Sequence, residues 1–500
     1  MRRSLVTFVS FLVAVSLTAQ QNFDKLASDA MSAWRFPGMA VAVVQGDRVI
    51  YLKGFGVKEV GKTDRVSPDS LFQIGSTSKA FTTTAMAMLV DEKKLDWDDP
   101  VRKNLEYFHL ADPCADSMVT LRDLVSHRTG VSRHDELWDN SPWSREEVIR
   151  RVGDVKLAKP IRTAYQYNNI MFIAAGEVVA AAAKTSWDDF VRARIFQPLG
   201  MTNTRTRFAD WATSDHATGH DWSHEQAVVH PASDDTNVGP AGSIKSSARD
   251  MAQWLRFQLA NGVIDTRRLV SEEALNETKS PQMALRVDKS ARETNPFTHV
   301  QSYAMGWIVQ DYRGELLITH GGALNGFRTN IALLPDRNAA VVILANMGRG
   351  FGVTALRNAI LDELLHASPS RDWNAAYLAV EKKADDRAQQ AKKDREAKRV
   401  PNTKPSRDLA AYAGTYRDPA YGDAVVALEN GALVLRWSRM QIPLSHYNYD
   451  TFLAVSEPDD VDETVQFALG PDGEVKTMSV FGEEFVRKDE GGRMKDESRR

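Results

Sequence analysis

The sequence contains very little cysteine, because Cys114 is the only one among 500 residues. A single thiol excludes an intramolecular disulfide and argues against a zinc site built from thiolates. We therefore expect Cys114 to be a small buried residue without a chemical role.

The sequence also lacks an excess of either charge. It has 63 Lys and Arg residues against 66 Asp and Glu residues, which gives a formal net charge of −3. This balance gives no indication of binding to nucleic acid or to an anionic membrane surface. A content of 43% hydrophobic and 26% charged residues is typical of a globular protein. The length predicts roughly two to four domains.

Long hydrophobic runs are missing except at the N-terminus. There, Arg2 and Arg3 precede an apolar run over residues 4–19, which is too short to span a membrane comfortably. This pattern predicts a secretory signal peptide at 1–19, cleaved near Ala19, and the alternative is an uncleaved anchor. No other run reaches membrane length, so we expect no membrane span after signal removal and a periplasmic or secreted protein.

What the sequence does contain is a strand-like run that ends at Gly75, followed by a helical pattern rich in alanine and methionine. Ser76 and Lys79 lie three residues apart, so on a helix they share one face. The free N–H groups at a helix N-terminus favour developing negative charge, and a nearby amine can take the serine proton. These are the conditions for an activated serine nucleophile. The alternative is a capping serine beside an exposed lysine, because this spacing occurs by chance about once in a chain of this length.

A second motif, Tyr167-Asn168-Asn169, comes directly before an apolar helical pattern at 170–183. An ammonium group close to the phenol would favour the phenolate, and Tyr167 would then act as general base and general acid for the serine. Asn169 would orient Lys79 or bind a substrate amide. The alternative is a core tyrosine followed by a helix-capping asparagine.

A third motif, His320-Gly321-Gly322-Ala323, closes the strand pattern at 316–319. Its two glycines would let another segment approach closely, because neither carries a side chain. The N–H groups of Ala323 and Ser76 could then form an oxyanion hole, with His320 as a proton-sensitive group beside it. The alternative is an ordinary tight turn after a strand.

The order, spacing and structural contexts of these three motifs resemble the serine β-lactamase and penicillin-binding-protein superfamily. Within it, the chain resembles the class C β-lactamase-related serine hydrolases, which include esterases, D-amino-acid peptidases and DD-peptidase-like proteins. The resemblance covers about residues 25–365. It extends to four further stretches, at residues 71–75, 121–130, 241–250 and 303–307.

The resemblance implies an α/β fold in which an antiparallel sheet is flanked by helices and joined to a helical domain. It also implies the roles of four residues. Ser76 would be the acylated nucleophile, and Lys79 and Tyr167 would manage its proton. Asn169 would complete the second motif.

The third motif departs from the family pattern. His320 stands where the penicillin-recognising members carry lysine, and Gly321 offers no hydroxyl to hold a β-lactam carboxylate. We therefore expect a peptidase or esterase rather than a dedicated β-lactamase. The predicted function is a secreted serine hydrolase that acts through an acyl-enzyme on small peptide, amide or ester substrates. The alternative function is a non-catalytic sensor or binding protein for penicillin-like or peptidoglycan-like ligands.

The predicted domains follow the signal peptide in this order: a hydrolase domain at 20–370, a charged helical linker at 371–405, an all-β barrel at 406–488 and a disordered tail at 489–500. Short alternating strands around the turns Asn430-Gly431 and Asp472-Gly473 indicate the barrel. It resembles the lipocalin-like domain that is often fused to these hydrolases. It would cover the catalytic groups and restrict substrate size, mediate homo-oligomer formation, or be a stabilising appendage.

Several histidines gather in one polar loop, namely His216, His220, His224 and His230. Such spacing could ligate a metal ion, but no carboxylate pattern accompanies it. The resemblance implies a metal-free enzyme without a cofactor.

Overall fold

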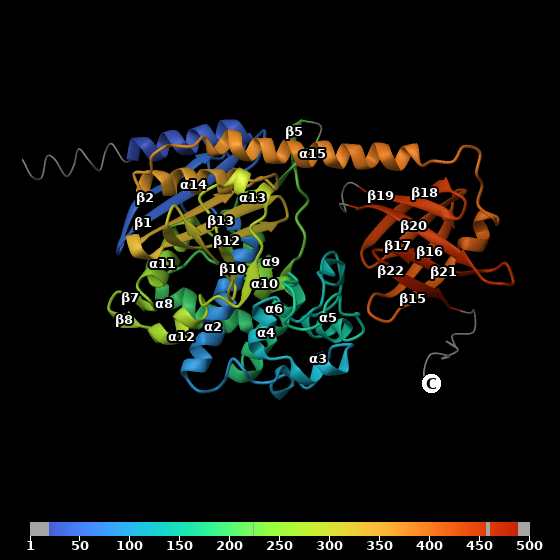
Figure 1. Cartoon of the computed structure of the whole chain (residues 1–500), viewed down its shortest axis with the longest axis horizontal. Coiled ribbons are helices and arrows are strands. Elements are labelled where there is room, and N and C mark those ends of the chain that lie inside the picture. The colour runs from blue at the N-terminus through green and yellow to red at the C-terminus, as the bar shows by residue number, and fades with distance from the viewer. Residues whose placement is uncertain (1–19, 224, 457–460, 489–500) are drawn as a thin grey trace, which may run out of the picture. The chain divides into compact units, whose positions relative to one another are not determined.

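The computed structural model describes residues 20–223, 225–456 and 461–488, so the predicted signal peptide, the predicted tail and His224 lie outside the described residues. The chain divides into two compact units (Figure 1). The first contains the described residues up to Arg133 together with Lys156–Lys383. The second contains His134–Val155 and the described residues from Ala384 onward.

An eight-stranded antiparallel sheet forms the centre of the first unit, in the order β2-β1-β14-β13-β12-β11-β10-β9. Its strands are β1 (Gly38–Gln45), β2 (Arg48–Gly56), β9 (Met283–Leu285), β10 (Gln301–Tyr303), β11 (Ile308–Tyr312), β12 (Glu315–Leu324), β13 (Phe327–Leu334) and β14 (Ala339–Ala345). Strand β1 pairs with β14, which is the last strand of this sheet in sequence order, and Val41 lies opposite Ile343. The sheet therefore joins the N-terminal and C-terminal parts of the unit, and this confirms the predicted fold class.

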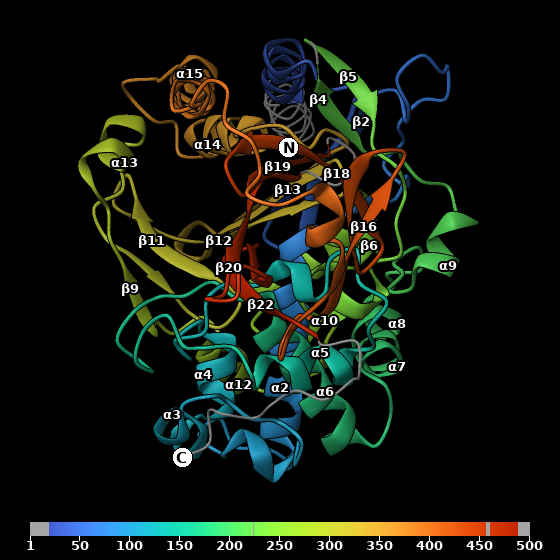
Figure 2. The same ribbon diagram turned by 90° about the vertical axis from the view of Figure 1, so that its right-hand side faces the viewer.

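Helices cover both faces of this sheet, which explains why β1 and β14 are continuous apolar runs. The helix at residues 20–34 and α14 (Gly352–Leu364) contribute to the core on one face. On the other side of the sheet lie α2 (Lys79–Asp91), α6 (Asn169–Ala183) and α10 (Gly239–Gly242), as Figure 2 shows. This second group of helices confirms the predicted helical domain.

Helix α2 is buried on all sides, with every residue from Lys79 to Leu89 inaccessible or nearly so. A helix with no polar face belongs in the middle of a protein. It is preceded by a 3₁₀ turn, η1 (Gly75–Ser78). The remaining helices of the unit are α3 (Pro113–Met118), α4 (Leu121–Val125), α7 (Trp187–Val191), α8 (Gln197–Leu199), α9 (Phe208–Ala212), α11 (Ala248–Leu259), α12 (Glu272–Glu277) and α13 (Lys289–Thr294).

Among the described residues, no single helix has both the length and the apolar character needed to cross a membrane. One bent pair, Asn169–Ala183 with Trp187–Leu199, meets that test when its two arms are taken together, at an angle of 75°.

The prediction that Cys114 is buried is wrong, because its side chain is exposed. It follows Pro113 in the short surface helix α3, in which Ala115 is the buried residue. The segment predicted as a charged helical linker at 371–405 is helical over most of its length. Helix α15 (Trp373–Ala397) buries Trp373 and Tyr377, which are four residues apart and so share one face.

The second unit is built around a closed barrel of eight antiparallel strands. They are β15 (Gly414–Asp418), β16 (Gly422–Glu429), β17 (Ala432–Trp437), β18 (Met440–Asn448), β19 (Thr451–Ser456), β20 (Val461–Leu469), β21 (Val475–Val480) and β22 (Glu483–Arg487). Buried and exposed residues alternate along the strands, as expected for a barrel with a filled interior. Asn430 and Gly431 both have positive φ, which is the conformation that a tight hairpin turn requires.

Residues 134–155 belong to the same unit as the barrel, although the sequence analysis placed them in the hydrolase domain. They include α5 (Arg145–Val152). Arg151 donates to the main-chain oxygen of Ala420 at 2.9 Å, and its guanidinium lies 3.7 Å from the ring centroid of Trp143. The Trp143 ring contacts Trp437 edge-on. Aromatic and cation–π contacts of this kind explain why the segment groups with the barrel.

Candidate active site

The turn η1 and the start of α2 bring Ser76 and Lys79 together. In a 3₁₀ turn, side chains three residues apart lie directly above one another. Lys79 Nζ donates to Ser76 Oγ at 3.0 Å. It also donates to Asn169 Oδ1 at 2.7 Å and to the main-chain oxygen of Ala241 at 2.8 Å. These contacts match the three hydrogens of an ammonium group, which explains how a fully buried lysine is accommodated.

The second motif reaches the same serine from the loop before α6. The Tyr167 hydroxyl donates to Ser76 Oγ at 2.6 Å. Lys79 Nζ lies 4.8 Å from the centroid of the Tyr167 ring. The helix cap is Asn168, whose Oδ1 accepts the N–H of Met171 at 3.1 Å. Asn169 does not cap the helix, and its amide oxygen accepts a hydrogen bond from Lys79.

The third motif lies inside a strand, whereas the sequence analysis placed it at the end of one. Strand β12 continues through His320, Gly321 and Gly322 to Leu324. Its close approach to η1 requires glycine on both sides. A Cβ on Gly75 would lie 2.5 Å from the backbone nitrogen of Ala323, and one on Gly322 would lie 2.0 Å from the carbonyl oxygen of Ile74.

Strand β12 therefore runs against the residues next to Ser76, with the backbone nitrogen of Ala323 close to Gly75. A Cβ on Gly321 would meet nothing closer than 3.8 Å, which is an ordinary van der Waals distance, so this position is not crowded. Ser76 and Tyr167 are partly exposed, and Gly321 and Ala323 are exposed. A ligand arriving from solvent can reach these four residues, with the buried lysine behind them.

His320 is buried and directs its ring into the protein. Its Nδ1 lies 2.6 Å from the main-chain oxygen of Gly321, and its Nε2 lies 3.1 Å from the hydroxyl of Tyr303. Burial, with the positive charge of Lys79 as a second cause, lowers the pKa of His320 to about 4. A neutral imidazole thus stands at the position where the resemblance expects a lysine in penicillin-recognising proteins.

The histidines of the polar loop point to separate partners. His216 Nδ1 lies 2.9 Å from the Ser214 oxygen, and His230 Nδ1 lies 2.6 Å from Asp221 Oδ2. His220 contacts the main chain through both ring nitrogens. Across the part of the chain that the structure describes, no group of three or more His, Cys, Asp or Glu side chains is arranged to hold a metal ion.

Comparison with known proteins places this geometry in a family. The profile of the Beta-lactamase family matches residues 23–365. The chain belongs to this family. It is therefore a member of the serine β-lactamase and penicillin-binding-protein superfamily of serine hydrolases. A second profile, described as a domain of unknown function (DUF3471), matches residues 398–493 and includes the barrel strands.

Two relatives illustrate the range of similarity. The protein named Unguisins hydrolase ungD' from Aspergillus campestris (strain IBT 28561) is 29% identical over 493 residues, which cover 93% of this chain and 89% of the relative. Protein flp from Staphylococcus aureus (strain NCTC 8325 / PS 47) is 25% identical over 334 residues, which cover 66% of this chain and 63% of the relative.

Solved structures share the fold. The octameric penicillin-binding protein homologue from Pyrococcus abyssi has a TM-score of 0.62 at 20% identity, covering 93% of this chain and 99% of that protein. A class C β-lactamase from Rhodobacter sphaeroides has a TM-score of 0.56 at 22% identity, covering 69% of this chain and 98% of that protein.

Sequence reasoning did not find every residue that contacts these groups. The carbonyl of Ala241 binds Lys79, and the side chains of His127 and Tyr303 lie behind Tyr167 and His320. All three lie in stretches on which the family resemblance rests, but nothing in their local sequence indicates a partner.

Proposed function

We propose that this protein is a serine hydrolase whose Ser76 forms an acyl-enzyme with peptide, amide or ester substrates. The observation that supports this proposal best is the environment of Ser76 Oγ, which lies 2.6 Å from the Tyr167 hydroxyl and 3.0 Å from Lys79 Nζ. A serine held between a phenol and an amine has both a base for its proton and a cation that stabilises that base.

In the proposed reaction, the Tyr167 phenolate removes the proton of Ser76 as Oγ attacks the substrate carbonyl carbon. The N–H groups of Ser76 and Ala323 stabilise the resulting oxyanion. Tyr167 then gives its proton to the leaving nitrogen or oxygen, and the bond to that atom breaks. A water molecule hydrolyses the Ser76 ester by the same steps in the same order.

The third motif supports a peptidase or esterase over a dedicated β-lactamase. Gly321 has no hydroxyl and His320 is neutral, so neither supplies the contacts that would hold a β-lactam carboxylate. Two relatives named unguisins hydrolases match 93% and 92% of this chain, which supports hydrolysis rather than binding alone. We further propose that residues 1–19 direct export and that the barrel is lipocalin-like.

Labelling with a fluorophosphonate followed by intact-protein mass measurement tests this proposal. We expect one adduct on the wild-type protein and none on Ser76→Ala. The matched control is Ser290→Ala, which removes an exposed serine from α13 and should leave the adduct unchanged. A wild-type protein that never forms an adduct would instead support the alternative of a non-catalytic binding protein.

The substrate class can be narrowed by comparing D-aminoacyl amides with short-chain esters, again with Ser76→Ala as the blank. Turnover of either class that disappears in Ser76→Ala would assign the scissile bond. Turnover that survives in Ser76→Ala would contradict the role of this serine.

A further inference from the structure

Three buried side chains, His127, Tyr303 and His320, form a continuous row of hydrogen bonds in the first unit. The main-chain N–H of Asn168 donates to His127 Nδ1 at 3.2 Å. His127 Nε2 lies 3.1 Å from the Tyr303 hydroxyl, which lies 3.1 Å from His320 Nε2. At the far end, His320 Nδ1 lies 2.6 Å from the carbonyl oxygen of Gly321. The row joins the second motif to the third.

The two backbone groups at its ends fix the direction of every bond in the row. An N–H group only donates, so His127 Nδ1 is an acceptor and the neutral ring carries its proton on Nε2. A carbonyl only accepts, so His320 carries its proton on Nδ1 and presents Nε2 as an acceptor. The Tyr303 hydroxyl therefore accepts from His127 and donates to His320. Every donor faces an acceptor only while both rings are neutral.

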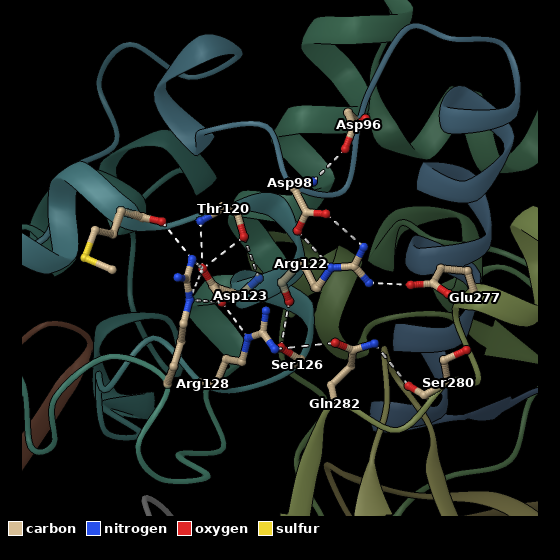
Figure 3. A network of polar contacts seen from close by, with 12 residues as sticks. Asp96, Asp98, Thr120, Arg122, Asp123, Ser126, Arg128, Glu277, Ser280 and Gln282 are labelled. Carbon is tan, nitrogen blue, oxygen red and sulfur yellow. Dashed lines mark hydrogen bonds and ion pairs between the residues drawn. The ribbon is translucent and has the colours of Figure 1, made fainter.

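The position of His127 is itself tightly fixed. Its φ is +57°, which is uncommon for a residue other than glycine. Its carbonyl accepts the N–H of Gln166 at 2.8 Å. The next residue, Arg128, pairs with the fully buried carboxylate of Asp123, which also binds Arg162. Figure 3 shows this network, in which Thr120 and Arg122 flank Asp123. An unusual backbone conformation held by its surroundings is a feature of functional regions.

We propose that His127 and Tyr303 are positioning residues, which act as a neutral hydrogen-bond relay that holds the Tyr167 segment and the His320–Gly321 strand in register around Ser76. The inference rests on the proposed hydrolase function. His127 acts on Tyr167 through the adjoining amide of Asn168 and through ring contact, with the two ring centroids 4.4 Å apart. Tyr303 acts on the third motif by fixing the ring and the tautomer of His320.

The charges around the relay agree with neutral rings. The titratable groups that act on it are two cations and two phenols: Lys79, Arg133, Tyr165 and Tyr167. Burial and the nearby positive charges lower the pKa of His127 well below its ordinary value. Burial also raises the pKa of Tyr303. At neutral pH all three members of the relay therefore remain uncharged.

Nitrogen NMR of the unreacted protein tests the relay directly. Ring ¹⁵N shifts distinguish the two neutral tautomers from the cation, and His127→Asn and His320→Gln assign the signals by their loss. We expect His127 as the Nε2–H tautomer and His320 as the Nδ1–H tautomer, both unchanged between pH 5 and pH 8. The opposite tautomers, or titration of either ring within that range, would overturn the proposal. Because this measurement uses no substrate, its outcome does not depend on whether the labelling experiment supports the proposed function.

Two substitutions that interrupt the relay test its effect on catalysis. Tyr303→Phe removes only the hydroxyl, and His127→Asn keeps an acceptor for Asn168 while losing the link to Tyr303. We expect each to slow fluorophosphonate acylation by roughly ten- to a hundredfold, as for a small misplacement of reacting groups. Because the two side chains belong to one row, the double variant should be no slower than the slower single variant.

Tyr165→Phe is the matched control, since its ring lies 5.3 Å from that of Tyr303 but outside the row. Burial raises the pKa of Tyr165, so it faces the relay as a neutral phenol, and it takes no part in the hydrogen bonds of the row. We expect Tyr165→Phe to leave the rate and the tautomers of His127 and His320 unchanged, whereas Tyr303→Phe shifts the ring ¹⁵N signals of both. Single losses that multiply in the double variant, or a wild-type rate in a folded Tyr303→Phe, would overturn the proposal. Should Tyr303→Phe fail to fold, His127→Asn and the wild-type tautomers still decide it.

Discussion

Replacing Gly322 by alanine should damage the proposed active site far more than its single methyl group suggests. The added Cβ would lie 2.0 Å from the carbonyl oxygen of Ile74, whereas ordinary contacts begin at 3.4 Å. The carbonyl oxygen belongs to the backbone and the position of a Cβ is set by the backbone that carries it, so no side-chain rotation can relieve the contact. Strand β12 and the residues before Ser76 must separate by about an ångström, and the Ala323 N–H moves with the strand.

The magnitude of the effect follows from this displacement. A misplacement of about 1 Å at a reacting centre can cost on the order of a hundredfold in rate. Crowding in a well-packed interior also lowers the free energy of unfolding by about 1–3 kcal/mol. We therefore expect Gly322→Ala to fold, to melt at a lower temperature, and to acylate Ser76 about a hundredfold more slowly than the wild type.

The assay is a time course of fluorophosphonate labelling, with thermal unfolding followed in parallel. Gly321→Ala is the matched comparison, because its Cβ would meet nothing closer than 3.8 Å. Its loss should be much smaller than that of its neighbour. Equal rates for the two variants, or a wild-type rate for Gly322→Ala, would refute the claim that the two segments touch at this point.

Three further predictions follow from other contacts. Lys79→Met, which keeps the length of the side chain but removes the amine, should slow labelling by about 10²–10⁴-fold, and a loss below about tenfold would contradict its role. The pKa of His320 is about 4 when folded and near 6.5 when unfolded, so the unfolded state binds the extra proton as pH falls. The free energy of unfolding should therefore drop by about 3 kcal/mol between pH 7 and pH 4 through this group. Denaturant titrations at several pH values should show that His320→Gln lacks this pH-dependent loss. Trp143→Ala removes one aromatic and one cation–π contact in the second unit and should destabilise that unit by about 2 kcal/mol, and an unchanged unfolding transition in calorimetry would contradict this role of Trp143.

Local pattern was sufficient for the buried strands. The strand-like patterns at 327–334 and 339–345 have the same bounds as β13 and β14 in the structure. β14 is an unbroken apolar segment followed by Asn346, and burial on two faces is what such a pattern indicates. β13 shows this pattern only at 331–334, after the polar residues 328–330. The Asn430-Gly431 hairpin was also foreseen, because the required positive φ values limit the choice of residues.

The local sequence pattern did not predict the structure where contact with a distant segment determines the backbone conformation. A continuous strand-like pattern covers 303–310, but β10 ends at Tyr303 and β11 begins at Ile308. Between them Gly306 has a φ of +76°, and a Cβ there would lie 3.0 Å from the carbonyl carbon of Lys79. The strand is interrupted where this turn passes α2, and nothing in the sequence of the turn indicates that it lies against this helix.

The candidate site shows the same division. Residues three apart in one turn are neighbours by construction, so the pairing of Ser76 with Lys79 follows from spacing alone. That the Tyr167 hydroxyl also reaches Ser76 depends on where a separate loop lies. The local pattern left a core tyrosine as the alternative, and the family resemblance favoured the catalytic role. The positions of His127 and Tyr303 depend on contacts between several elements, which is why neither received a role.

The two groups that would activate Ser76 are held in place to different degrees. The amine of Lys79 is held by groups from three elements, whose bond lengths of 2.7–3.0 Å leave little freedom for its position. The phenol of Tyr167 is partly exposed and comes from a loop, so its position depends on what supports that loop. The main-chain N–H groups of Gln166 and Asn168, one residue to either side of Tyr167, both donate to His127. Variation in reactivity among close relatives should therefore follow changes behind Tyr167 more than changes around Lys79. Substitutions at position 127 should alter the acylation rate without altering the dependence on Lys79, and a survey of such variants that found the reverse would contradict this view.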